Sequence, residues 1–337
     1  MRGMRFVWSL LLLGCRGPEL TPLGDPGVAG AAEAREAPPE REPPSTAEGG
    51  AGASAAEPPR AEPEGGAAAA SDCSAQPITL EEAHSGQVRP GVAVSLGELV
   101  ATSQKFLVSE AKSGSCLWGA FAAGLDMTGA GSGLFLVSFG AAHEAGQTCR
   151  SGSDGLPDDL VPGDRLQVQG FLSDYVPGGC AQGTAAQAQL RVDASCPARR
   201  VGTGPEPEAE QIEPAVADTL AAGRDPELLR AYGGALVELQ AVAARQDPDD
   251  GDAVFPFGVM RLAETALELH SRIYYFDLSE GGPRAVGKAP SFPFPTQLER
   301  VRGVVFLDYC TWALGPRDRC LDSVPASDGC APQAHGP

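Results

Sequence analysis

A run of closely spaced aspartates, Asp247, Asp249, Asp250 and Asp252, is the strongest candidate in the sequence for metal chemistry. Several carboxylate oxygens on a loop that contains a glycine are typical ligands of Ca²⁺. The spacing does not fit an EF-hand loop, because Asp252 stands where the sixth position requires glycine. We therefore expect a solvated hairpin turn, keep the four aspartates as weak candidate ligands, and predict no bound metal and no cofactor.

The histidines offer no catalytic pattern. They are His84, His143, His270 and His335. General acid–base catalysis or metal binding needs a histidine beside a carboxylate or beside another histidine. His270 follows the alternating apolar residues Leu267 and Leu269, so we expect it on the solvent-facing side of a strand.

Motifs for nucleophilic or phosphate chemistry are also missing from the sequence. Gly152-Ser153-Asp154-Gly155 resembles a loop and lacks the strand–turn–helix context of a nucleophile elbow. The sequence contains no phosphate-binding loop of the Walker type. We therefore predict that the protein is not an enzyme.

Five aromatic residues could form a platform on which a ligand stacks. They are Trp118, Tyr175, Tyr274, Tyr309 and Trp312. Exposed rings of this kind bind oligonucleotides or sugars in small β-barrels. The alternative is that the rings fill the cores of the domains, and we favour this for Tyr175, Tyr309 and Trp312.

Cysteine usage indicates an exported protein. Cys15 lies in the leader, and an even set of eight follows: Cys73, Cys116, Cys149, Cys180, Cys196, Cys310, Cys320 and Cys330. In an oxidising compartment these form up to four disulfides. Five of the eight lie before residue 200 and three lie after residue 300, so full pairing requires a bridge between the early and the late group. We expect Cys310–Cys320 and Cys73–Cys330, with the other four pairing among themselves. A zinc site is disfavoured because Cys-x2-Cys spacing is missing.

The first residues combine a charged start with a short apolar run, as in a secretory signal. The run ends in Leu10-Leu11-Leu12-Leu13-Gly14-Cys15, which resembles the bacterial lipobox. This resemblance implies that Cys15 becomes the lipid-bearing N-terminus of the mature protein. It also implies an outer-membrane lipoprotein, on the periplasmic or the cell-surface face, because Arg16 replaces the aspartate that retains such proteins in the inner membrane. The alternative is an ordinary signal peptide.

Composition limits the possible partners. The net charge is −19, from 44 acidic and 25 basic residues. Such a surface repels phosphate backbones, which makes nucleic acid an unlikely partner. We expect the membrane as a partner through the lipid anchor, and a protein or glycan of the envelope as a possible second one; the oligomeric state is open.

Short strands dominate the segment after residue 72. Runs at 92–102, 105–109, 133–139, 165–172 and 188–192 have strand composition. Pro162-Gly163-Asp164 is a turn, and Gly170 inside the following strand indicates a bulge or a bend. This order, with Gly-Asp-x-Leu-x-Val-x-Gly and then Asp174-Tyr175, resembles the OB-fold-like domain of exported bacterial proteins. In some of these proteins it accompanies extracellular nucleases or phosphoesterases.

The second part of the chain repeats the first. Helices are expected at 214–220 and 225–230, followed by strands at 232–242, around 267–276, at 297–309 and at 312–317. The segment Val301-Arg302-Gly303-Val304 and then Asp308-Tyr309 corresponds to Val168-Gln169-Gly170-Phe171 and Asp174-Tyr175. Two similar copies favour tandem domains over one large sheet.

We therefore predict an all-β chain with two tandem OB-like β-barrels and a short helix before the second. The domains are a signal peptide at 1–15, a disordered Pro/Glu/Ala-rich tether at 16–72, a first barrel at 73–200, a linker at 201–213, and a helix plus second barrel at 214–337. The predicted function is that of a lipid-anchored envelope protein that binds or scaffolds an unknown ligand. The alternatives are an accessory subunit of a nuclease or phosphoesterase system and a purely structural spacer.

Overall fold

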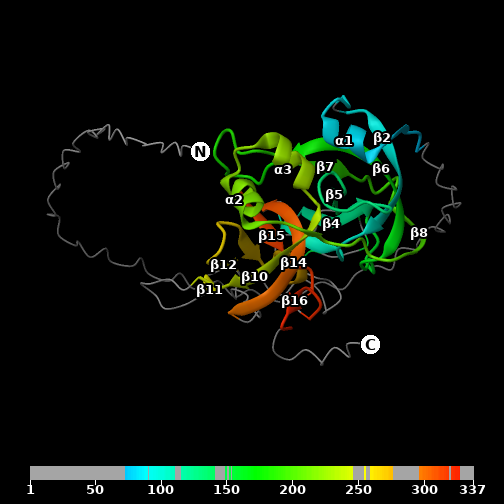
Figure 1. Ribbon diagram of the computed structural model, residues 1–337. Helices are drawn as coiled ribbons and strands as arrows, with labels where there is room; N and C mark the ends of the chain where they lie inside the picture. The colour runs from blue at the N-terminus through cyan, green and yellow to red at the C-terminus, as the bar shows by residue number, and fades with distance from the viewer. Residues whose placement is uncertain are drawn as a thin grey trace, which may run out of the picture. The chain divides into compact units, whose positions relative to one another are not determined.

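The computed structural model describes residues 73–89, 91–110, 115–140, 149, 152, 154–245, 254–255, 259–275, 296–318 and 320–326. The leader, the tether and the aspartate run at 247–252 lie outside these residues. No helix in the described part is long and apolar enough to cross a membrane. The structure is mostly β-sheet with a few short helices, and the described residues belong to one compact unit (Figure 1).

The first half, residues 73–203, forms one sheet. Its strands are β1 (Gln76–Ile78), β2 (Ala93–Ala101), β3 (Phe106–Glu110), β4 (Cys116–Gly124), β5 (Gly133–Phe139), β6 (Asp164–Tyr175), β7 (Gln187–Arg191) and β8 (Arg199–Thr203). They pair in the order β1-β2-β4-β5-β7-β6-β8, with β3 beside β4 and an additional pairing between β2 and β6. Strand β4 was not expected, because its Gly/Ala-rich composition obscures a strand that is buried along nearly its whole length.

A short helix, α1 (Leu80–Ser85), lies between β1 and β2 and was also not expected. Thr79 caps it: the Thr79 hydroxyl accepts a hydrogen bond from the Glu82 amide at 3.1 Å, and the Glu82 carboxylate accepts one from the Thr79 amide at 2.7 Å. This reciprocal pair is a capping box. The helix ends at Gly86, whose φ of 70° is left-handed.

The second half, residues 210–324, forms the other sheet. Its strands are β9 (Glu210–Gln211), β10 (Leu236–Ala243), β11 (Val254–Phe255), β12 (Val259–Arg261), β13 (Glu268–His270), β14 (Gln297–Asp308), β15 (Thr311–Gly315) and β16 (Ser323–Val324). Their order is β11-β12-β13-β15-β14-β10-β9, with β16 beside β14. The helices α2 (Pro214–Ala222) and α3 (Pro226–Tyr232) match their predicted positions.

Two details of the second half correct the sequence interpretation. Ile273 and Tyr275 lie in a helix, α4 (Arg272–Tyr275), and not in a strand. The segment expected to be a linker at 201–213 contains the end of β8 and the whole of β9, which pair with β6 and β10.

The two halves share one scheme of strand pairing. Each begins with a short strand that is parallel to the next strand (β1–β2 and β9–β10), and each has helical residues between these two strands. Each also contains a second parallel pair, β5–β7 and β13–β15. Gly170 and Gly303 hold equivalent places, opposite Val94 of β2 and Val237 of β10. The sequence repeat therefore corresponds to a structural repeat.

Gly170 does not mark a bulge, because its pairing with β2 is regular and the register shift lies between Leu96 and Glu98 of β2. A Cβ on Gly170 would instead overlap the carbonyl oxygen of Arg191 at the end of β7. A Cβ on Gly303 would meet the main chain of Gly315 at the end of β15, 2.7 Å away. Glycine is thus required at both positions, because β7 approaches Gly170 and β15 approaches Gly303 too closely for a side chain.

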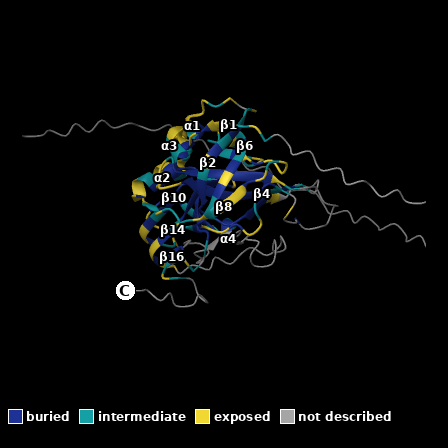
Figure 2. Cartoon of the chain, turned by 90° about the vertical axis from the view of Figure 1, so that its right-hand side faces the viewer, coloured by how far each residue is buried: buried dark blue, intermediate teal, exposed yellow. Residues whose placement is uncertain are grey.

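The hydrophobic core has three parts, and one of them joins the halves. Two clusters lie mainly within one half each. The third combines residues of both halves: Phe106, Val108, Phe121, Phe135, Val137, Leu236, Ile273, Val304, Phe306 and Ala313. In Figure 2 the strands are largely buried, whereas β8 carries exposed residues.

Three disulfides link described residues: Cys73–Cys196, Cys116–Cys149 and Cys180–Cys310. Cys320 is disulfide-bonded as well. The expected bridges Cys310–Cys320 and Cys73–Cys330 are wrong, because Cys310 and Cys73 have other partners. Of the four cysteines expected to pair among themselves, Cys116 and Cys149 do so, whereas Cys180 and Cys196 pair with Cys310 and Cys73. The expected bridge between the early and the late cysteines exists as Cys180–Cys310.

Candidate functional site

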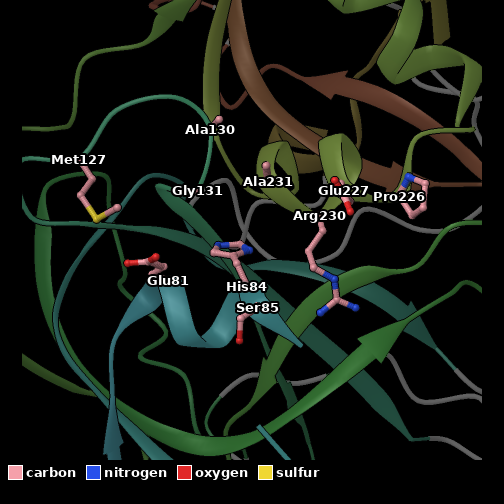
Figure 3. A pocket seen from close by; sticks show the side chains of 10 residues that line it. All are labelled: Glu81, His84, Ser85, Met127, Ala130, Gly131, Pro226, Glu227, Arg230 and Ala231. Carbon is pink, nitrogen blue, oxygen red and sulfur yellow. The ribbon is translucent and has the colours of Figure 1, made fainter. Parts of the chain in front are cut away.

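A cavity of about 610 Å³ lies between the helices α1 and α3 and the turn that joins β4 to β5 (Figure 3). Its lining residues are Glu81, His84, Ser85, Met127, Ala130, Gly131, Pro226, Glu227, Arg230 and Ala231. The lining residues of α1 lie at 81, 84 and 85, and those of α3 at 226, 227, 230 and 231, so that residues three or four apart place one face of each helix along the cavity. We call this cavity the groove.

Local sequence sets the position of the α3 wall. Asp225 caps α3 by accepting a hydrogen bond from the Leu228 amide at 3.0 Å, and Pro226 occupies the first turn, where it needs no amide hydrogen. The β4–β5 turn is fixed to α3 because the Gly131 amide donates to the Ala231 carbonyl at 2.7 Å. The groove is therefore built from both halves of the chain.

Close backbone contact between β5 and the entry to β10 also holds the halves together. A Cβ on Gly133 would overlap the main chain of Gly234 and Ala235. Gly234 itself has a left-handed φ of 93°. These two glycines allow β5 and the entry to β10 to approach more closely than side chains would permit.

Arg230 is the basic residue of the groove wall. Its Nη2 lies 3.2 Å from Oδ1 of Asp174, and both side chains are partly exposed, at 32% and 58%. The guanidinium also lies over Gly86 at the end of α1, since a Cβ there would be 3.2 Å from Nη1. Arg230 lines a second, smaller cavity of about 230 Å³ as well, together with Gly86 and Asp174.

The surroundings of His84 favour its neutral form. Its Nε2 lies 2.8 Å from the Gly133 carbonyl oxygen and so donates to it. Burial lowers the pKa of His84 below its ordinary value, and the positive charge of Arg230 acts in the same direction, while the main-chain oxygens of Gly133 and Arg230 oppose this. The groove thus presents two carboxylates, one guanidinium and a neutral imidazole beside apolar side chains.

The aromatic candidates do not gather on one face. Trp118 and Trp312 are buried in the separate cores of the two halves. The ring of half-buried Tyr175 meets Phe135 edge-on, with 5.6 Å between centroids. Tyr309 does not fill a core as expected, because it is 55% exposed; its ring centre lies 5.0 Å from Cζ of Arg272. The side chain of Tyr274 lies outside the described residues.

His270 belongs to a buried polar cluster and does not lie on a solvent-facing strand surface as expected; its side chain is 3% exposed. Its Nδ1 lies 3.0 Å from Oδ2 of Asp308, and its Nε2 lies 3.4 Å from Oε2 of Glu268. Burial alone would lower the pKa of His270, but the hydrogen bonds to both carboxylates and their charges raise it above its ordinary value. Arg272 completes the cluster by donating to Asp308 at 3.0 Å.

The described residues contain no group of three or more histidine, cysteine or acidic side chains that could hold a metal ion. The candidate ligands Asp247, Asp249, Asp250 and Asp252 lie outside those residues. Sequence reasoning missed the groove because it did not recognise α1. The signal was present, since Thr79-x-x-Glu82 has the spacing of a capping box.

Comparisons of the chain with protein-family models, with curated proteins and with solved structures gave no match.

Proposed function

We propose that this chain is an exported, envelope-anchored protein that binds a small ligand in the groove. The observation that carries the proposal is the groove itself, where two helix faces from different halves present charges of both signs around apolar surface. Its volume of about 610 Å³ lies in the range of small-molecule sites. The groove lies where the two halves meet, and such junctions commonly hold ligands.

The finer fold proposal is that each half is an OB-like barrel. In its favour, the first half pairs in the cycle β2–β6–β7–β5–β4, and β4 pairs again with β2. In the second half β10–β14–β15–β13–β12 follow the same order, and an isolated bridge joins Ala244 to Leu262. The groove is lined by α1 of the first half, by α3, which lies between the two halves, and by the turn that joins the strands β4 and β5.

Export is supported by the disulfides. Bridges within and between the halves indicate an oxidising compartment outside the cytoplasm. We propose that Cys15 carries the lipid and that residues 16–72 form the tether. A Cys15→Ala variant should then move from the membrane fraction to the soluble fraction, and it should keep its disulfides. A variant that still sediments with the outer membrane would refute the anchor.

The groove is best tested through its methionine. Met127 lines the groove, whereas Met260 is fully buried in the core of the second half. In a full-length protein with ¹³C-methyl methionine, a library of small polar compounds should contain members that shift the Met127 methyl signal and leave the Met260 signal in place.

A blocked variant provides the control for this screen. Ala130→Trp places a large ring in the groove and should abolish the Met127 shifts. Ala222→Trp, at the exposed end of α2, should leave them intact. If no compound moves Met127, or if the shifts survive in Ala130→Trp, binding in the groove is refuted and a structural spacer becomes the better description.

A further inference from the structure

We propose that the ligand of the groove is a free α-amino acid with an apolar side chain, whose carboxylate binds Arg230 and whose ammonium group binds Glu227. This inference rests on the proposed function and names the class of ligand. It is argued from the charges of the groove, from their spacing on α3, and from the apolar residues beside them.

Arg230 is suited to accept a carboxylate. A guanidinium has five N–H donors, and its one ion pair among the described residues joins only Nη2 to Asp174. Both partners are partly exposed, and such a pair contributes little to stability. A ligand carboxylate that binds in bidentate fashion makes stronger hydrogen bonds than this single contact of 3.2 Å. Arg230 is therefore available to a ligand.

Glu227 provides the complementary charge. It lies three residues before Arg230, so both side chains project from the same face of α3. Within the described part of the chain, Glu227 forms no ion pair, with Arg230 or with another residue. An unpaired acid and a base that line the same groove are complementary to a small molecule that carries both charges. Glu81 on α1 adds a second carboxylate to the lining.

The same charges disfavour ligands with one kind of charge. A simple anion at Arg230 would face Glu81 and Glu227 in a chain whose net charge is −19. A simple cation would leave the donors of Arg230 unused. The remaining lining residues Met127, Ala130 and Pro226 offer apolar surface for an aliphatic side chain (Figure 3).

Three matched compounds test the proposal in the full-length protein. L-Leucine carries both charges, 4-methylpentanoate lacks the ammonium group, and 3-methylbutylamine lacks the carboxylate. Titration of the Met127 methyl signal should give a dissociation constant for leucine that is about tenfold or more below that of either single-charge compound, because each charged contact is lost in one of them.

Substitutions assign each charge to its residue. Glu227→Gln should remove the advantage of leucine over 4-methylpentanoate, and Arg230→Gln should remove its advantage over 3-methylbutylamine. Glu299→Gln and Arg224→Gln, which change exposed residues outside the groove lining, are the matched controls and should bind leucine as the unmodified protein does.

Asp174→Asn separates a binding role of Arg230 from a structural one. It breaks the same ion pair as Arg230→Gln but leaves the guanidinium in place. Leucine should bind this variant as well as, or more tightly than, the unmodified protein. If Asp174→Asn weakens binding as much as Arg230→Gln, the ion pair is structural and the assignment of the carboxylate is overturned.

The outcomes distinguish the two proposals. If either single-charge compound binds as tightly as leucine, or if other compounds shift Met127 and leucine does not, the amino-acid assignment is overturned while the groove stays a binding site. If no compound shifts Met127, the proposed function fails together with the inference.

Discussion

His270 shows how neighbouring carboxylates set the protonation of a buried imidazole. Burial favours its neutral form, but Asp308 and Glu268 each lie within hydrogen-bonding distance and favour the imidazolium. The pKa of His84 is shifted in the opposite direction, mainly because burial disfavours its charged form; the positive charge of Arg230 acts in the same direction. The two histidines therefore contribute to stability with opposite dependence on pH.

The sign of each contribution gives a first prediction. Because its folded-state pKa is raised, the stabilisation from His270 is fully present below the ordinary pKa of about 6.5 and is lost as pH rises through the folded-state value. The difference in urea midpoint between the unmodified protein and His270→Gln should thus shrink from pH 5.5 to pH 8.5.

His84 supplies the matched comparison. Its folded-state pKa is lowered, so its contribution is present above about pH 6.5 and is lost as pH falls below that value. The difference in urea midpoint between the unmodified protein and His84→Gln should therefore grow from pH 5.5 to pH 7.5.

Parallel stability curves for the unmodified protein and His270→Gln, plotted against pH, would show that the carboxylates do not control the protonation of His270.

The burial of His270 illustrates what the sequence could not reveal at the residue level. Alternation around Leu267 and Leu269 correctly indicates a strand, β13. Asp308 lies 38 residues further along the chain, and only the pairing of strands brings it to His270. Arg230 and Asp174 are likewise 56 residues apart. A side chain's partners depend on topology, so the candidate site could not be assembled from spacing alone.

At the level of elements, sequence patterns located strands best where polar and apolar residues alternate. Strand β6 contains the alternation of Leu166 and Val168 with polar residues, and it was predicted. Strand β4 lacks alternation because both of its faces are buried, and it was missed. The helix α1 was too short for a helical period to be visible, although its cap was present in the sequence.

The two glycines at equivalent places in β6 and β14 lead to a second prediction. Gly170→Ala should lower the free energy of unfolding by about 1 to 3 kcal/mol, because its Cβ would overlap the main chain of β7. Chemical denaturation measures this loss. Gly97→Ala in β2 is the matched control, since a Cβ there has open space around it and should change stability little. Equal losses for both variants would refute the close-approach explanation.

At the scale of the whole molecule, the halves are joined in several independent ways. Cys180–Cys310 links them covalently. Arg317 is buried, forms an ion pair with Asp322 at 2.6 Å, and donates to the Thr102 carbonyl of the first half at 2.7 Å. The third core cluster contains apolar residues of both halves. The halves should therefore unfold together.

A third prediction tests this coupling. Replacing Cys180 and Cys310 with serine should lower the free energy of unfolding by about 2 to 5 kcal/mol and still give one transition, because the shared core is retained. Denaturation followed by far-UV circular dichroism and by tryptophan fluorescence measures both features.

Replacing Cys73 and Cys196 provides the comparison. This bridge spans 123 residues against 130 for Cys180–Cys310, so both restrict the unfolded chain to a similar degree. Unlike Cys180–Cys310, it lies within the first half. Two separate transitions in the Cys180/Cys310 variant would show that the core alone does not couple the halves.

The stacked phenylalanines of the first half suggest how such a chain could arise. Phe121 and Phe135 stack with 4.7 Å between centroids, and Phe306 of the second half meets Phe121 edge-on at 6.0 Å. If duplication of a single ancestral gene produced the repeat, the ancestor would have carried this aromatic surface without its present cover. Phe121 and Phe135 lie on β4 and β5, whereas Phe306 lies on β14, the counterpart of β6. The two copies therefore meet through non-equivalent strands, and the contact differs from the self-complementary one of a two-fold symmetric homodimer.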